Sequence, residues 1–325
     1  MSHIATTATR VLVIGANGQL GSELTDALRE RHGADAVVAT DIAPAGRNPA
    51  WRYETLDVLD AAALNDTVRR LGITQVYHLA AALSARGEQD PAWAWDLNMR
   101  SLLNVLECAR HQRLDKVFWP SSIAAFGPST PRLDTPQTTV MDPGTVYGIS
   151  KLAGERWCAW YHATHGVDVR SLRYPGLISW KTPPGGGTTD YAIDIFHGAI
   201  TQGRYTCFLK EDQALPMMHM ADAVRATLDL MAAPAEAVKE RGSYNLGGIS
   251  FTPAELAAAI ARRVPGFTMR CEPDFRQAIA QSWPARIDDS AARADWGWAP
   301  TYDLDGLVDD MLVNLRALLV PPHAA

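Results

Sequence analysis

Short apolar runs alternate with longer stretches of helical periodicity over the first half of the chain. Strands are predicted at 11–14, 37–40, 51–57, 75–81, 116–120 and 169–174, and the helices between them end near residues 32, 71, 111 and 165. Such regular alternation is typical of a parallel sheet with helices on both faces. We therefore expect an α/β fold with a doubly wound parallel sheet.

The pattern changes after residue 174. Residues 181–190 are rich in glycine, proline and threonine and predict a loop over the site, since no regular element tolerates that composition. Short strands are expected at 205–209 and 267–271, helices at 220–231 and 253–263, and a return to the main sheet at 243–246. The predicted division is a sheet domain at 1–174, with segments returning from about 216–263, and a smaller, split lobe at 175–215 and 264–325.

The first predicted strand runs into a loop with Gly15, Gly18 and Gly21, and this loop opens a helix. Glycines allow the tight turn and close backbone approach that a bound pyrophosphate needs, and the helix N-terminus supplies amide donors. Asp41 ends the second strand, where a carboxylate accepts hydrogen bonds from the ribose hydroxyls and repels a 2′-phosphate. The combination predicts a Rossmann domain that prefers NAD to NADP, although nearby Arg47 keeps NADP open. An ordinary strand–helix turn is the alternative interpretation of the glycines alone.

The other cofactor-binding candidates follow the carboxyl ends of the predicted strands, because ligands of such sheets bind there. Asp57 and Val58 end the third strand and could approach the adenine. Small residues after the fourth strand would let a flat cofactor lie close to the backbone, or could equally pack beneath a helix. The predicted NAD-binding set is Gly15, Gly18, Gln19, Leu20, Gly21, Asp41, Ile42, Asp57, Val58, Leu79, Ala80, Ala81, Asn98, Tyr147, Lys151, Tyr174 and Pro175.

Tyr147 and Lys151 are four residues apart and share one face of a predicted helix. A phenol with a pKa of about 10 is a poor base near neutrality, but a neighbouring ammonium or a positively charged nicotinamide favours the phenolate. The pair could then take a proton from an alcohol. The alternative is a solvated lysine beside a half-buried tyrosine. Ser121 and Ser122 end the fifth strand, so their hydroxyls are expected at the same site.

Composition narrows the class of protein. With 325 residues, 47% of them hydrophobic, the chain can bury a sizeable core, and its net charge of −6 argues against a nucleic-acid partner. No window holds the roughly 18 apolar residues of a membrane helix, and no signal peptide is evident, so a cytoplasmic protein without a membrane partner is expected. The four cysteines have no metal or redox spacing and are expected to be reduced core thiols. No metal is required by these patterns.

These motifs resemble those of the extended short-chain dehydrogenase/reductase family, also called the NAD-dependent epimerase/dehydratase group. The resemblance covers nearly the whole chain, and Ile14 departs from it, since threonine is common there. The residues that carry it are the glycine loop, Asp41, Asn98, the serine before Phe126 and Gly127, Tyr147 with Lys151, the run from His219 to Asp222, and Trp296-Gly297-Trp298 with Pro300.

Within that family the chain is most similar to the short-chain type of L-threonine 3-dehydrogenase. The similarity lies in LRYPGLI at 172–178, PPGGG at 183–187 and TTDYA at 188–192. Sugar-nucleotide epimerases usually carry an Asn-Pro or Pro-Asn step after the sixth strand and a later Arg-x-Gly-Asp element that grips the diphosphate. This chain has YPG at 174–176 and SWPAR at 282–286 instead. The difference favours a small polar substrate in a site lined by glycine and threonine donors.

The resemblance implies NAD-dependent oxidation of L-threonine at its 3-hydroxyl to 2-amino-3-oxobutanoate. Tyr147 would accept the hydroxyl proton, Lys151 would hold the ribose hydroxyls and lower the pKa of Tyr147, and Asn98 would carry a proton-relay water. Ser122 is expected to hydrogen-bond the substrate oxygen, and Ser121 is the alternative for this role. The implied substrate-binding residues are Ser84, Ser122, Tyr147, Gly187, Thr188 and Trp283, with the loop acting as a lid that lies away from the adenosine half of NAD.

Assembly is also predicted from the resemblance. Related enzymes pair two helices from each subunit, and here the corresponding helices carry apolar stripes that include Leu102, Leu103, Val105 and Leu106 in one and Trp157 and Trp160 in the other. A homodimer is expected, unless both stripes belong to the core. Two other functions stay open: a nucleotide-sugar 4-epimerase or dehydratase, which shares the Rossmann features, and a non-catalytic NAD-binding protein.

Overall fold

The computed structural model of the chain describes residues 8–183 and 185–319. Within these residues the central sheet has seven strands in the order β10-β6-β5-β4-β1-β2-β3, and all neighbours are parallel. The strands are β1 (Val11–Ile14), β2 (Val37–Asp41), β3 (Arg52–Thr55), β4 (Gln75–His78), β5 (Lys116–Ser122), β6 (Val169–Tyr174) and β10 (Tyr244–Asn245). The expected doubly wound parallel sheet is therefore confirmed.

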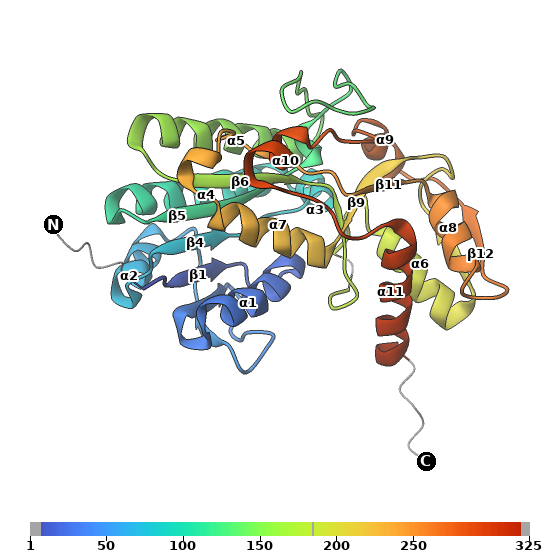
Figure 1. The fold of residues 1–325 in the computed structure, drawn as a ribbon, viewed down its shortest axis with the longest axis horizontal. Coiled ribbons are helices and arrows are strands. Elements are labelled where there is room, and N and C mark those ends of the chain that lie inside the picture. The colour runs from blue at the N-terminus through green and yellow to red at the C-terminus, as the bar shows by residue number, and fades with distance from the viewer. Residues whose placement is uncertain (1–7, 184, 320–325) are drawn as a thin grey trace, which may run out of the picture.

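Two helix layers cover this sheet because its strands are apolar on both faces. One layer holds α2 (Ala61–Leu71), α4 (Pro91–Gln112) and α5 (Val146–His165), and the other holds α1 (Gln19–His32) and α7 (Met220–Ala232). Figure 1 shows α5 on one side of the sheet and α1 and α7 on the other. A short helix, α3 (Ser84–Gln89), precedes α4 and was not predicted.

The chain leaves the main sheet at Pro175, which lacks the N–H that a continuing strand would need. It enters β7 (Gly176–Ile178) in a three-stranded sheet with β9 (Leu215–His219) and β11 (Ile249–Phe251). A Cβ on Gly176 would lie 2.3 Å from Sδ of Met217 and 2.7 Å from Cγ2 of Thr189, so a glycine permits this close packing. The sequence analysis missed all three strands.

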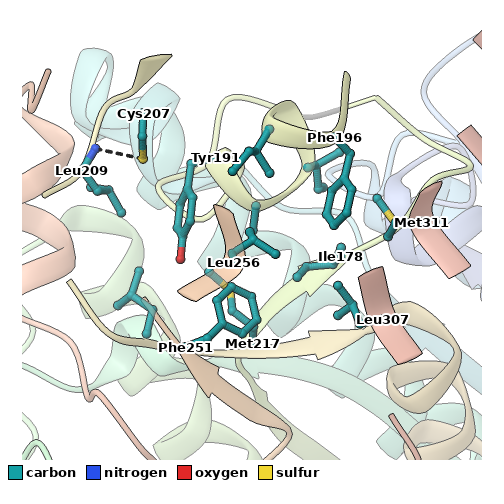
Figure 2. Packing of buried hydrophobic residues seen from close by; sticks show 14 of the residues in the cluster. Ile178, Tyr191, Phe196, Cys207, Leu209, Met217, Phe251, Leu256, Leu307 and Met311 are labelled. Carbon is teal, nitrogen blue, oxygen red and sulfur yellow. Dashed lines mark hydrogen bonds between the residues drawn. The ribbon is translucent and has the colours of Figure 1, made fainter. Parts of the chain in front are cut away.

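A two-stranded parallel sheet pairs β8 (Arg204–Cys207) with β12 (Thr268–Cys271). The helices of this part of the chain are α6 (Tyr191–Gln202), α8 (Pro253–Ala261), α9 (Arg276–Gln281), α10 (Ser290–Trp296) and α11 (Leu304–Leu319). Apolar side chains from α6, α8, α11 and the small sheets form one cluster, in which Tyr191, Phe196, Leu256 and Leu307 are completely buried (Figure 2). This core supports the loop between β7 and α6 from below.

Several predicted boundaries shift in the structure. The predicted strand at 75–81 stops at His78, because Asn98 binds both the amide and the carbonyl of Ala82 and turns the chain away from the sheet. β3 is shorter than predicted and β5 runs on to Ser122. The helices α6, α9, α10 and α11 were not predicted. The return of residues 244–245 to the main sheet beside β6 is confirmed.

Candidate active site

The carboxyl ends of β1, β4, β5 and β6 open into a cavity of about 280 Å³ that the loop before α6 and Trp283 close from the other side. The predicted residues that line it are Gly15, Gly18, Gln19, Leu20, Gly21, Leu79, Ala81, Ser84, Ser121, Ser122, Tyr147, Lys151, Tyr174, Pro175, Gly187, Thr188 and Trp283. The predicted residues outside its lining are Asp41, Ile42, Asp57, Val58, Ala80 and Asn98. Leu83, Pro120, Ile123, Gly176, Leu177, Thr189 and Asp190 line it without having been predicted.

The glycine loop forms a cradle in which the backbone is packed too closely for side chains at Gly15 and Gly21. Gly15 has a φ of 83°, and a Cβ there would lie 2.6 Å from the amide nitrogen of Ala80. A Cβ on Gly21 would lie 2.2 Å from the carbonyl oxygen of Gly15. The Nε2 of Gln19 is buried beside the cavity without a hydrogen-bond partner among the described residues. A buried, unpaired donor at a helix N-terminus fits a phosphate-bearing cofactor.

Asp41 stands at the end of β2 next to the glycine loop. Its Oδ2 accepts from the amide of Asn17 at 3.2 Å, and its Oδ1 accepts from the amide of Ala43 at 3.3 Å. The neighbouring Ile42 side chain is 71% exposed. Arg47 donates to the Thr182 hydroxyl at 2.7 Å, so its guanidinium is bound to the loop before α6. The carboxylate of Asp41 therefore lies beside the cradle, where the ribose is expected, and the guanidinium of Arg47 is already engaged by Thr182.

Asp57 and Val58, shortly after β3, have different surroundings. Asp57 is exposed, and its carboxylate accepts from the amide of Leu59 at 2.9 Å. The side chain of Val58 is buried in the core, while its carbonyl oxygen accepts from the Asn104 amide at 2.9 Å. Neither residue lines the cavity, and the exposed carboxylate of Asp57 stays a candidate for contact with an adenine.

Helix α5 begins directly beside the end of β5. Thr145 caps it by accepting from the amide of Gly148 at 3.0 Å. A Cβ on Gly148 would lie 2.1 Å from the carbonyl oxygen of Ala124, and one on Gly154 would lie 2.4 Å from the Trp119 ring. The two glycines therefore let the helix pack closely on β5 and the turn that follows it. This packing brings Tyr147 and Lys151 to Ser122.

Burial shifts the pKa values of both Lys151 and Tyr147. Nζ of Lys151 lies 4.5 Å from the ring centroid of Trp119 and 5.4 Å from that of Tyr147, and it donates to the carbonyl oxygen of Pro120 at 2.5 Å. Burial lowers the pKa of Lys151 to about 7. Burial raises the pKa of Tyr147 to about 12, against a lowering by its hydrogen bond with Ser122. The expected depression of the phenol pKa by Lys151 is therefore not found, because burial dominates and the only lowering comes from Ser122.

The two serines at the end of β5 have different partners. The hydroxyl of Ser121 is buried and donates to Oε1 of Glu155 at 2.6 Å. The hydroxyl of Ser122 accepts from the amide of Ala124 at 3.2 Å and hydrogen-bonds Tyr147. Sequence reasoning missed Glu155, although its position four residues after Lys151 places it on the same helix face.

Asn98 lies behind the cavity. Its Oδ1 accepts from the amide of Ala82 at 2.7 Å, and its Nδ2 donates to the carbonyl of Ala82 at 3.2 Å and to Ser150 at 3.0 Å. The side chain thereby holds the segment after β4 against α5. His78, on β4, is buried and hydrogen-bonds Ser101 at 2.9 Å, and burial lowers its pKa to about 3.

The loop between β7 and α6 carries the polar wall of the cavity. The Thr188 side chain is 1% exposed, and its hydroxyl finds no hydrogen-bond partner among the described residues. Oδ2 of Asp190 accepts from the amides of Gly186 and Gly187, each at 2.7 Å, and burial raises the pKa of this carboxyl. Ser84 and Trp283 are both 5% exposed. Pro184 of the predicted motif lies outside the described residues.

The first residues of this loop contact the cofactor side of the molecule. Glu23 on α1 accepts a hydrogen bond from Ser179 and forms an ion pair with Lys181 at 3.5 Å. Thr182 binds Arg47 in the loop after β2. The expectation that the loop lies away from the adenosine half therefore fails for its beginning.

Residues 8–183 and 185–319 lack two further features. No group of three or more His, Cys, Asp or Glu side chains in this part of the chain could hold a metal ion. None of its helices is both long and apolar enough to cross a membrane.

The model of the NAD dependent epimerase/dehydratase family matches residues 11–247. The chain belongs to this family. NAD is therefore its cofactor, in agreement with the glycine cradle and the unpaired Gln19 amide. An uncharacterized epimerase/dehydratase of Staphylococcus haemolyticus is 46% identical over 310 residues, which cover 93% of this chain and 96% of that relative.

Solved structures of similar proteins narrow the comparison. The GalE-like L-threonine dehydrogenase of Cupriavidus necator, in its holo form, is 66% identical, with a TM-score of 0.93 and coverage of 94% of this chain and 99% of that one. A monomeric L-threonine 3-dehydrogenase from a metagenome, in its apo form, is 45% identical, with a TM-score of 0.92 and coverage of 95% and 99%. Together with the family these neighbours identify an NAD-dependent oxidoreductase.

Proposed function

We propose that the protein oxidises L-threonine at its 3-hydroxyl to 2-amino-3-oxobutanoate. The observation that carries this proposal is the arrangement of one cavity. Tyr147 and Ser122 lie on its sheet side, and on its loop side lies the Thr188 hydroxyl, which is buried and has no partner within residues 8–183 and 185–319. A small substrate with an alcohol at one end and a carboxylate at the other satisfies both sides. The identity of the dehydrogenase neighbours supports the same substrate.

Each residue has a role that its surroundings support. Tyr147, as phenolate, accepts the substrate's hydroxyl proton while Ser122 hydrogen-bonds the same oxygen. Lys151 binds the ribose hydroxyls of the cofactor and favours the phenolate by its charge. The Gly187 amide and the Thr188 hydroxyl bind the substrate carboxylate, and Ser84 and Trp283 contact its amino and methyl ends. When bound, NAD supplies the acceptor for the hydride.

A nucleotide-sugar 4-epimerase or dehydratase is the main rival. Such an enzyme needs a cation for the substrate diphosphate, and Arg286 stands in the segment where that cation is expected. Arg286 forms an exposed ion pair with Asp134 and does not line the cavity. The site therefore favours the smaller substrate, and the presence of Ser122, Tyr147 and Lys151 together disfavours a non-catalytic NAD-binding protein.

The test measures NADH formation by the purified chain with L-threonine and with 3-hydroxybutyrate, and in parallel it measures conversion of UDP-sugars by product analysis, because an epimerase or dehydratase reoxidises its own NADH and releases none. We expect turnover with threonine, and Tyr147→Phe should abolish it. Turnover with a UDP-sugar alone would refute the proposal. NAD should also be used far more efficiently than NADP, and Asp41→Ala should narrow that gap because it removes the charge that repels a 2′-phosphate. Equal use of both cofactors by the unmodified protein would contradict the role of Asp41.

We also propose a homodimer built on α4 and α5 and retain the predicted division into a cofactor domain and a substrate lobe. Leu102, Val105 and Leu106 are buried in their own subunit and do not reach the surface. Trp157 and Trp160 are 39% and 46% exposed on α5 and would supply the contact. A similar dehydrogenase is described as monomeric, and the proposal of a dimer for this chain rests on the exposed Trp157 and Trp160.

A further inference from the structure

A completely buried carboxylate lies behind the candidate active site. Glu155 on α5 has no exposed surface, and it follows Tyr147 and Lys151 at helical spacing, so the three side chains share one face of the helix. A buried charge requires a partner, because desolvation of an unpaired carboxylate is costly. The partner here is an arginine from the neighbouring strand.

Arg173 on β6 binds Glu155 through two parallel hydrogen bonds. Its Nε lies 2.9 Å from Oε1 and its Nη2 lies 2.8 Å from Oε2. The remaining Nη1 donates to the carbonyl of Gln137 at 3.0 Å and to Oδ1 of Asn245 at 2.9 Å. Since all these partners are fixed by the main sheet, the carboxylate of Glu155 is held in one orientation.

The same carboxylate also binds a residue of the cavity. Oε1 of Glu155 accepts the hydroxyl hydrogen of Ser121 at 2.6 Å, a charge-assisted bond in a buried setting. Ser121 has only one hydrogen to donate. Its hydroxyl is therefore turned toward Glu155, and Ser122 is left as the hydroxyl that can donate to a substrate oxygen.

We propose that Glu155, fixed by Arg173, is a positioning residue for the reaction: it draws the Ser121 hydroxyl away from the substrate and supports the positive charge of Lys151 from one helical turn away. This inference rests on the proposed function. The alternative is that the ion pair only fastens α5 to β6.

The electrostatics around Lys151 agree with this role. Burial lowers the pKa of Lys151, and the negative charge of Glu155 acts in the opposite direction. The other titratable neighbours are Tyr147, with its ring centroid 5.4 Å from Nζ, and His78, whose pKa is lowered by burial and by the charge of Lys151. Arg156, 4.0 Å from Glu155, is the second cation near the carboxylate, beside Arg173.

The test compares Glu155→Gln with Glu155→Asp in the full chain. Removal of a negative charge lowers the pKa of every nearby titrating group, so both limbs of the pH profile of kcat/KM should move to lower pH in Glu155→Gln, by about one unit for a charge at this separation. Glu155→Asp keeps the charge and should restore the limbs. A structural role alone would lower kcat/KM at every pH without moving the limbs.

Asp168→Asn is the matched control. Asp168 pairs with Arg170 at 2.8 Å at the opposite end of β6, so its loss breaks a comparable ion pair away from Lys151. We expect its pH limbs to stay in place. A second measurement gives the pKa of Lys151 itself. Lys151 is acylated with acetic anhydride at a series of pH values without NAD or threonine, and the product is quantified by mass spectrometry. This labelling separates failure of the inference from failure of the proposed substrate.

Serine variants keep the inference testable if Glu155→Gln does not fold. Ser122→Ala should lower kcat/KM at least about tenfold more than Ser121→Ala does, because only the former removes the donor to the substrate. Unmoved labelling of Lys151 in Glu155→Gln, or a loss in Ser121→Ala as large as that in Ser122→Ala, would overturn the inference.

Discussion

Replacement of Thr188 by valine should change stability and activity in opposite directions. Its hydroxyl is buried and has no hydrogen-bond partner among the described residues, and an unsatisfied buried hydroxyl costs about 1–3 kcal/mol. Valine has the same shape without the polar group, so we expect the free energy of unfolding to rise by about 1 kcal/mol. Loss of the hydrogen bond to the substrate carboxylate should lower kcat/KM for threonine more than about tenfold, which corresponds to about 1.4 kcal/mol.

The assay pairs chemical denaturation, in the absence of NAD and threonine, with steady-state kinetics. Thr135→Val is the control, because Thr135 is also completely buried but donates to the carbonyl of Pro131 at 2.5 Å. That variant should lose about 1 kcal/mol of stability and keep its kcat/KM. If Thr188→Val were destabilised like the control, or kept its activity on threonine, the assignment of Thr188 to the substrate carboxylate would be refuted.

Three further predictions address the cofactor, the lysine and the assembly. Gly21→Ala should weaken NAD binding at least about tenfold, measured by calorimetry, because its Cβ would lie 2.2 Å from the Gly15 carbonyl, whereas Gly144→Ala, with open space around it, should not. Because burial lowers the pKa of Lys151 to about 7, the unfolded chain binds more protons than the folded protein between about pH 7 and 10. The free energy of unfolding should rise with pH through that window, and Lys151→Met should flatten the rise. Light scattering should give the mass of a dimer at micromolar concentration and that of a single chain for Trp160→Glu; a single-chain mass for the unmodified protein would contradict the dimer.

The main sheet was predictable because its strands are short apolar runs bounded by glycines, and because helices with clear apolar stripes lie between them. The same rules failed beyond Tyr174. There β7 follows a Pro-Gly step that ordinarily marks a turn, and β9 contains Pro216, which argues against a strand by composition. Both strands belong to a small sheet whose partners are distant in sequence, so local pattern carries little information about them.

The candidate site shows the same division. The three glycines have a fixed spacing within one loop, and Tyr147 and Lys151 have a fixed spacing within one helix. The sequence therefore predicted both groups at the same site, and both line one cavity. Contacts between different helices and strands could not be predicted from the sequence. Nothing in the sequence around Ser121 indicates that Glu155 takes its hydroxyl hydrogen, because the two lie on a strand and a helix that meet only in the folded protein. Their separation also explains why the sequence left the choice between Ser121 and Ser122 open.

The contacts of Glu23 explain how two ligands could be placed by one rigid unit. This residue lies on α1, one turn after the glycine cradle, and it binds Ser179 and Lys181 at the start of the loop that ends in Thr188. Asp190 fixes the other end of that loop through the amides of Gly186 and Gly187. The polar wall of the cavity is therefore tied to the helix that begins at the glycine cradle. Trp180 of the same loop also packs against the apolar cluster under α6, so polar contacts with α1 and an apolar contact with that core together hold the loop.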